Sequence, residues 1–570
     1  MLRSVEAYQH AIMEIKIGLN ALTPIGRLPP ELLAGIMLII VRDYYDYMDN
    51  HALHWIKVTT TVCRSWRCLA LDTPVLWGYI TLDMVSEHFA GFIARSKRAP
   101  LFVKTFVSVN DTRSAAVKQA VHALVRESAR LQELQLQAPV RLLRVVCGRM
   151  TCPAPKLRSL VLVAGNRDFD TKPTASETPT LIATPGSLPN LRHLEIRDVP
   201  IMWQDAIFIN PSVTSLTVIL PPALASRIRR GQLNVGTFEE LLLALEQLAP
   251  SLQSLTLEGS IPLSTTDTTD VSPSTRMISF PSLRSIQLVG DTYCCASLLR
   301  HMSMPSIGSV NIRGYGNDGV AEVAQRLSED FSRMEPWQAA ELKSSANSVD
   351  LTAWTGDVTY FERQPVVLTF EASTSTNTSL LAILSQAHVW FKSLLRLVMM
   401  GSYHSLKWAD LFVALPQLRE LYIDSDPPPS FFVALRPKSR PNIQAPLPHL
   451  RIIELGYVMF HPLPYQRRIP MTDNTSVEFF PAFLKTLKLR ASARFPLTEV
   501  HIKSCIRVQP ADVKALKQVV PNVKWDAQED MHDPSGDSGS DSDSDSDAYD
   551  SDGMSIQGNA GLDSEDSDEE

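Results

Sequence analysis

The stretch that decides the fold is Pro250-Ser251-Leu252-Gln253-Ser254-Leu255-Thr256-Leu257. Its leucines follow a Leu-x-x-Leu-x-Leu spacing, in which the second and third are two residues apart. On a short strand those two side chains point to the same side, into a core. The proline and serine before the pattern end the preceding segment and restart the chain as a strand. The stretch therefore predicts one short strand with one buried face.

The same spacing recurs along the chain, with helix-like stretches such as 237–248 and 320–331 between copies. Ten copies begin at Leu131, Leu157, Leu191, Val213, Leu252, Leu283, Ile307, Leu418, Leu450 and Leu484, and weaker ones at Ala346, Leu394 and Leu497. Successive starts from Leu131 to Ile307 are 26, 34, 22, 39, 31 and 24 residues apart, which excludes a regular array of equal repeats.

This pattern predicts an α/β fold, namely an irregular solenoid of the leucine-rich-repeat type. The alternative is a doubly wound α/β fold, because buried parallel strands of any such sheet are rich in leucine.

Residues 24–82 have a different, helical pattern. Pro29-Pro30 is predicted to open a helix, with an apolar face formed by Leu32, Leu33, Ile36 and Ile40. A second helix is predicted over residues 58–71, with an apolar face formed by Val58, Val62, Trp66 and Leu69. Such a unit, with Trp66 and Trp77 in its core, is too small to be very stable alone, so we expect it to dock on a partner or on the repeats.

This segment resembles the F-box, in particular the F-box-like proteins that fungi carry in large families. The matching residues are Leu28, Pro29, Glu31, Leu32, Leu33, Ile36, Val62, Cys63, Arg64, Trp66, Arg67, Ala70, Pro74 and Trp77. The resemblance covers residues 10–110 closely and the repeats loosely. One departure is the stretch 42–54, which is longer and richer in Tyr and Asp than the link of a minimal F-box.

The resemblance implies that the module binds the Skp adaptor and, through it, the cullin of an SCF ubiquitin ligase, while the repeats hold a protein substrate. The adaptor-binding residues that it implies are Leu28, Pro29, Leu32, Ile36, Val62, Cys63 and Trp66. Core packing within the module is the alternative role for each. F-box proteins recruit and do not catalyse, so we expect a non-enzyme. The alternative function is a repeat-based interaction scaffold without a ligase role.

The outward positions of the repeat strands predict a substrate-binding surface. The candidates are Arg197, Arg313, Tyr422, Lys488, Arg490 and Lys503. Because the last three are basic and come late in the chain, we expect an acidic segment of the substrate near the final repeats.

Residues 314–319 spell GxGxxG after a predicted strand and before a predicted helix, the context of a dinucleotide site. That site also needs an acidic residue about 20 positions on, at the end of a second strand, and residues 335–341 show no strand pattern. We therefore predict a strand-to-helix turn, with cofactor binding as the alternative. The sequence holds no HExxH, GxSxG or CxxC motif, so no cofactor or metal is expected.

The net charge of −7 is unevenly distributed. Residues 526–570 hold 17 acidic side chains and no Lys or Arg, which leaves +10 on the first 525 residues. Ten serines and one aromatic residue in this tail predict disorder. Ser538, Ser540, Ser542, Ser544 and Ser567 each precede an acidic residue by three positions, which resembles targets of casein-type kinases; a solubilising tail is the alternative.

The longest apolar run, 32–41, is about half the roughly 20 residues that span a bilayer. Charged residues interrupt the N-terminus, where a signal peptide would need an apolar core. We therefore expect a cytoplasmic or nuclear protein, with no membrane or nucleic-acid partner. The predicted order is a helical lead-in (1–23), an F-box-like domain (24–82), an irregular leucine-rich-repeat domain (83–525) and a disordered acidic tail (526–570).

Overall fold

The computed structural model divides the chain into two units, Met1–Gln528 and Glu529–Glu570. It describes residues 2–47, 54–81, 88–112, 114–149, 153–165, 188–230, 235–263, 276–316, 318–331, 336–345, 348–355, 366–371, 390–401, 403, 406–437, 445–461 and 479–527. The predicted disordered tail beyond Ala527, with the five serines that resemble kinase targets, lies outside these residues.

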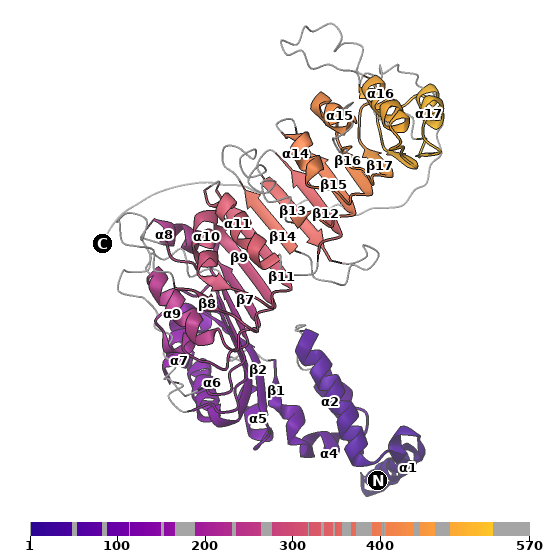
Figure 1. Cartoon of the computed structure of the whole chain (residues 1–570). Coiled ribbons are helices and arrows are strands. Elements are labelled where there is room, and N and C mark those ends of the chain that lie inside the picture. The colour runs from indigo at the N-terminus through magenta and orange to yellow at the C-terminus, as the bar shows by residue number, and fades with distance from the viewer. Residues whose placement is uncertain are drawn as a thin grey trace, which may run out of the picture. The chain divides into compact units, whose positions relative to one another are not determined.

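The fold is mixed α/β, built on one large and mostly parallel sheet that has 17 strands within the described residues (Figure 1). Its first half runs in chain order, each strand parallel to the next: β1 (Tyr79–Ile80), β2 (Leu101–Phe106), β3 (Leu131–Ala138), β4 (Ser159–Ala164), β5 (His193–Arg197), β6 (Ser215–Ile219), β7 (Ser254–Glu258), β9 (Ser285–Asp291) and β11 (Ser309–Tyr315). Beside it, β8 (Ile278–Ser279) and β10 (Met302–Ser303) form a separate parallel pair.

The middle of the sheet reverses the chain order. β11 is followed in space by β14 (Val366–Glu371), then β13 (Ser348–Trp354) and β12 (Ala339–Ser344), and β13 runs antiparallel to both neighbours. Parallel order then resumes through β15 (Arg396–Gly401), β16 (Glu420–Asp424), β17 (Ile452–Gly456), β18 (Glu499–Lys503) and β19 (Asn522–Trp525).

Helices connect many of the strands, and Figure 1 shows several of them, such as α10 and α11, along one side of the sheet. The bounds after β1 are α5 (His88–Arg95), α6 (Ala115–Arg126), α7 (Val140–Arg149), α8 (Pro222–Arg229), α9 (Phe238–Leu248), α10 (Thr292–Arg300), α11 (Val320–Phe331), α14 (Trp408–Val413), α15 (Pro429–Leu435), α16 (Phe479–Ser492) and α17 (Pro510–Lys517). The two helices predicted over 237–248 and 320–331 are confirmed as α9 and α11. Thr237 closes a capping box on α9 with Glu240.

The spacing that predicts the strands also sets their register. Leu255 of β7 pairs with Leu216 of β6 and Ile286 of β9, and all three side chains are fully buried. Side chains at alternate positions, such as Thr256, face the other side and are half-buried. Nine of the ten strong copies of the pattern form such strands, so the strand prediction is confirmed for them.

The strand predicted from the tenth copy is wrong, because Leu484, Leu487 and Leu489 lie in α16. Phe479, Phe483 and Leu487 lie four residues apart and are all buried, a spacing that places them on one face of a helix packed on a core. The strand of this region is β18, which follows the weaker copy at Leu497.

Two further expectations need correction. The second predicted helix is broken into α3 (His54–Thr60) and α4 (Arg64–Asp72), with residues 61–63 outside both. β12 lies at 339–344, where the sequence showed no strand pattern, although two strands separate it from β11. The GxGxxG stretch begins in β11, which ends at Tyr315, and α11 starts directly after it at Val320, as predicted for a strand-to-helix turn; Gly316 and Gly319 have φ +97 and +92.

Candidate partner-binding surfaces

The N-terminal helices are α1 (Leu2–Leu22), the short 3₁₀ helix η1 (Ile25–Arg27), α2 (Pro30–Tyr47), α3, α4 and a second 3₁₀ helix, η2 (Pro74–Gly78). Pro29 and Pro30 start α2 as predicted: the missing amide of Pro30 costs nothing at the first helical position, and the backbone amides of Leu32 and Leu33 donate to the Pro29 carbonyl.

The buried face of α2 consists of Leu33, Met37, Val41 and Tyr45, one residue per turn. This differs from the predicted face, which combined Leu32, Leu33, Ile36 and Ile40. Of those four, only Leu33 is buried. The helix therefore has a second apolar face that the described part of the chain does not cover.

That second face is a stripe formed by Leu32, Ile36 and Ile39, which we call the α2 stripe. These side chains are 58%, 38% and 60% exposed. Their spacing of four and three residues places them on one side of the helix. Val62, in the break between α3 and α4, is 58% exposed as well. Exposed apolar side chains gathered along one helix are typical of a surface that another protein covers.

The predicted adaptor-binding residues fall into two groups. Pro29, Leu32, Ile36 and Val62 are exposed, whereas Leu28, Cys63 and Trp66 are half-buried. Trp66 also packs against the hydrophobic core, so much of its surface is already used. The sequence reasoning missed Ile39, although it lies one turn beyond Ile36 on the same face.

The N-terminal helices share their core with the start of the sheet. Trp77 lies 5.4 Å from Trp55 of α3 and 5.1 Å from Phe92 of α5, measured between ring centroids. Its indole nitrogen donates to the Ala70 carbonyl at 2.9 Å, and the Arg95 guanidinium lies 4.8 Å above its ring. Trp77, not Trp66, is therefore the central aromatic residue of the module.

The far end of α2 is fixed to the sheet through Tyr45. Its hydroxyl donates to Glu133 of β3 at 3.3 Å, and its carbonyl accepts from Lys104 of β2 at 2.9 Å. Burial and the nearby Glu133 carboxylate raise the pKa of Tyr45, so the phenol stays protonated and keeps donating. Held at this end, α2 presents its stripe on a rigid element.

The open face of the sheet carries four of the six predicted substrate residues. Arg197 and Arg313 are exposed at outward positions of β5 and β11, and Tyr422 is half-buried on β16. Burial and then Asp424 raise the pKa of Tyr422 to about 12. Lys503 of β18 is exposed, but its ammonium lies 2.5 Å from the Glu454 carboxylate.

The other two residues, Lys488 and Arg490, are not on this face, because both belong to α16. Arg490 is fully buried and donates to the carbonyls of Leu435, Pro446 and Leu447 at 3.2, 2.8 and 3.0 Å. Burial lowers its pKa to about 10. The prediction that Lys488, Arg490 and Lys503 form one basic surface for an acidic substrate segment is therefore wrong.

The last strands instead carry balanced charges. Glu499 accepts hydrogen bonds from His501 at 2.8 Å and Lys524 at 3.0 Å. The first of these lowers the pKa of Glu499 most. His501 also lies 3.7 Å from Glu454, the partner of Lys503. Such a surface suits a polar segment of mixed charge.

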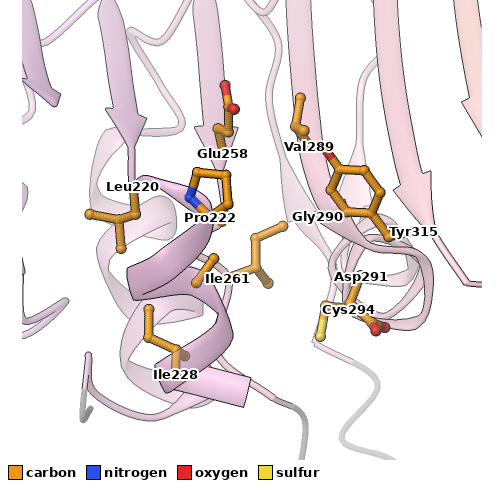
Figure 2. Close-up of a pocket in the computed structure, with 12 residues that line it drawn as sticks. Leu220, Pro222, Ile228, Glu258, Ile261, Val289, Gly290, Asp291, Cys294 and Tyr315 are labelled. Carbon is orange, nitrogen blue, oxygen red and sulfur yellow. The ribbon is translucent and has the colours of Figure 1, made fainter. Parts of the chain in front are cut away.

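A cavity of about 320 Å³ opens at the carboxyl ends of β6, β7, β9 and β11 (Figure 2). Its walls are mainly apolar, with two carboxylates and a phenol among them: Leu220, Pro222, Ala225, Ile228, Glu258, Gly259, Ile261, Val289, Gly290, Asp291, Cys294 and Tyr315. Figure 2 shows Pro222 and Ile228 of α8 facing Asp291 and Cys294 across it.

Glycine explains why the cavity stays open. Gly290 of β9 pairs with Gly314 of β11, and a Cβ at Gly290 would meet no atom within 4 Å. On the other side, Leu220, Leu224, Ile228 and Val235 form a small cluster apart from the main core. The cavity is of a size that takes one bulky side chain or a small apolar molecule.

No protein-family model matches this chain, and no curated protein matches it in sequence. Within the described ranges, no three or more His, Cys, Asp or Glu residues are grouped so that they could hold a metal ion. Across those same residues, no helix has the length and hydropathy needed to cross a membrane.

Proposed function

We propose that this protein is the substrate-recruiting subunit of an SCF-type ubiquitin ligase. In this proposal, residues 24–82 are an F-box-like module that binds a Skp adaptor and, through it, a cullin. The remaining strands and helices form an irregular leucine-rich-repeat solenoid that binds a protein substrate. The single observation that carries the proposal is the α2 stripe with Val62, exposed on the elements whose sequence resembles the F-box.

The stripe supports adaptor binding on energetic grounds. Full burial of an exposed Leu, Ile or Val side chain contributes about 1.5–3 kcal/mol. Leu32, Ile36, Ile39 and Val62 are only partly exposed, so each contributes a fraction of that amount. Since α2 is already anchored through Tyr45, little ordering entropy would oppose the association.

The sheet supports the second half of the proposal. Parallel strands in chain order give a long open face with polar outward positions, the usual binding surface of repeat proteins. We place substrate contacts at Arg197, Arg313, Tyr422 and Lys503 and no longer at Lys488 or Arg490. The protein would recruit its substrate and leave the chemistry to the ligase partners.

The test is co-purification with the Skp adaptor. We expect Leu32→Asp and Ile36→Asp to abolish capture, because each buries a charge in the apolar contact. The matched control is Val433→Asp, since Val433 is an apolar residue 64% exposed on α15. All three variants should keep the melting temperature of the unsubstituted chain, because none of these side chains is buried.

A folded protein that never captures the adaptor would overturn the proposal. In that case the open face still argues for the alternative, a repeat-based scaffold that binds partners without changing their ubiquitination. Such a scaffold would capture its partners with equal yield whether or not it carries Leu32→Asp. The cellular lifetime of those partners would also be the same with either chain.

A further inference from the structure

Helix α1 carries a second apolar seam, separate from the α2 stripe. The seam consists of Val5, Tyr8, Ile12, Ile15, Leu19 and Leu22. Their successive spacings are 3, 4, 3, 4 and 3 residues, which is the a/d pattern of a coiled coil. An apolar row with this period stays on one side of a helix that winds around another helix.

The seam is unoccupied by the described part of the chain. Its six side chains are between 52% and 72% exposed, and every α1 residue whose burial the structure describes is exposed. A helix of 21 residues gains most of its stability from packing an apolar face, because isolated helices are marginal in water. An uncovered seam along its whole length therefore implies a partner helix of the same period.

We propose that the partner is α1 of a second copy of this chain, in an antiparallel two-helix coiled coil. In that arrangement Val5 lies against Leu22 of the second copy, Tyr8 against Leu19 and Ile12 against Ile15. Reversing the helices gives the same three contacts again, so all six layers are filled by apolar pairs. The seam is thus complementary to itself without any gap in register.

The flank of the seam favours the antiparallel direction. Ser4, Ala11 and Gly18 lie seven residues apart on one side of it, at the g positions. In an antiparallel pair this flank faces the same flank of the other helix, so small residues meet small residues and the backbones approach closely. A parallel pair would instead place this flank opposite the e positions, where Lys16 would face Ala11 and have no acidic partner.

Charge also permits self-pairing. Within α1, Arg3 and Lys16 balance Glu6 and Glu14, so two copies of the helix do not repel each other. With Lys16 opposite Gln9 of the second copy, the antiparallel register places no like charges together across the seam.

The first experiment measures the mass of the full chain by light scattering after size exclusion, over a series of concentrations. We expect the mass to rise from 63.4 kDa towards twice that value as concentration increases. The double substitution Ile12→Asp with Ile15→Asp should hold it at 63.4 kDa. Met13→Asp is the matched control, because Met13 is 57% exposed on the same helix but lies off the seam.

A single mass of 63.4 kDa up to the solubility limit would overturn the proposal, as would a dimer that survives the double substitution. Neither result would affect the α2 stripe, whose test is adaptor capture.

The second experiment fixes the direction of the helices by disulfide cross-linking. In the antiparallel register Ala11 faces Gly18 of the second copy, so the double substitution Ala11→Cys with Gly18→Cys should form a cross-linked dimer under mild oxidation. Ile12→Cys should not, because Ile12 then faces Ile15. The unsubstituted chain, with its own seven cysteines, supplies the background. Stronger cross-linking through Ile12→Cys than through the Ala11→Cys and Gly18→Cys pair would contradict the antiparallel pair.

Discussion

Three arginines close the carboxyl ends of helices in this molecule. Arg130, Arg326 and Arg490 each donate to a main-chain carbonyl in the last turn of a helix far away in sequence, at the ends of α5, α10 and α15. The accepting carbonyls are those of Ile93, Leu299 and Leu435, respectively. The last four carbonyls of a helix have no amide donor in the helical ladder, and they lie at its negative end, so a cation there is doubly favourable.

The position of Arg490 could not be predicted from the sequence around it. A single Arg in an apolar pattern is compatible both with an outward position on a strand and with a buried guanidinium that donates to main-chain carbonyls. The choice depends on carbonyls at 435, 446 and 447, more than 40 residues earlier, which no local pattern indicates.

We therefore predict that Arg490→Met destabilises the protein by about 2–4 kcal/mol, because three carbonyls, those of Leu435 and Leu447 buried and that of Pro446 half-buried, lose their donor. Chemical denaturation measures this free energy of unfolding. Lys488→Met is the control, since Lys488 is exposed on the same helix, and it should change stability by no more than about 0.5 kcal/mol. Equal stabilities for the two variants would show that Arg490 has no clamping role.

At the scale of elements, period alone decides which predictions succeed. The Leu-x-x-Leu-x-Leu pattern predicts a strand correctly where the surrounding apolar residues do not also fit one face of a helix. The pattern at Leu484 fails because its first two leucines, three apart, also fit one face of a helix, and Phe479 and Phe483 extend that face. β12 was missed because it reads Ala-Ala-Glu-Leu-Lys-Ser, with small residues in place of large apolar ones.

Helix α2 shows how much of the candidate adaptor-binding surface could be predicted from the sequence. Its sequence is apolar on two sides, so its existence and start were predictable but its buried face was not. Which side faces the core is set by Trp55, Trp77 and Tyr79, elsewhere in the chain, and the exposed side follows only by difference. Four of the seven adaptor-binding residues predicted from the resemblance lie on that exposed side or beside it, at Val62.

The two faces predict opposite results for adjacent leucines. Leu33→Ala should destabilise the protein by about 2–5 kcal/mol, because Leu33 is buried and its loss leaves a cavity. Leu32→Ala should leave stability within about 0.5 kcal/mol, because Leu32 is largely exposed. Thermal and chemical unfolding of both variants measure this difference. A larger loss for Leu32→Ala than for Leu33→Ala would mean that the helix is rotated by about a third of a turn.

At the scale of the whole molecule, the reversal at β12–β14 leaves the buried rows of the sheet intact. Leu368 of β14, Leu351 of β13 and Leu342 of β12 continue the row from Ile312 of β11 to Met399 of β15. An antiparallel strand still presents alternate side chains to one face, so direction can change without breaking the core. Sequence spacing fixes the face of each strand but not its neighbour, which is why the order could not be predicted.

Charge divides the chain more sharply than any structural boundary. The tail was predicted to start at Asp526, but Asp526 still belongs to the folded unit, because its carboxylate accepts a hydrogen bond from the Ser504 amide at 2.6 Å. Cutting after Gln528 spares that bond. It leaves 54 basic against 45 acidic side chains, a net +9, and removes 16 acidic residues with no basic one.

We predict that the chain truncated after Gln528 keeps the melting temperature of the full chain but binds heparin more tightly. A net positive body attracts a polyanion, whereas the full chain at −7 is repelled by it on average. Elution from a heparin column at pH 7 should therefore shift to higher salt on truncation. As a control, a full-length chain in which every Asp and Glu of residues 529–570 is changed to Asn or Gln should elute at the same salt concentration as the truncated chain. Because salt screens such attraction, the difference should also disappear when loading is done near 1 M salt, where the Debye length is about 3 Å.

Identical elution of full and truncated chains at low salt would mean that the acidic residues do not offset the charge of the body, and a lower melting temperature of the truncated chain would mean that residues 529–570 contribute to its folding.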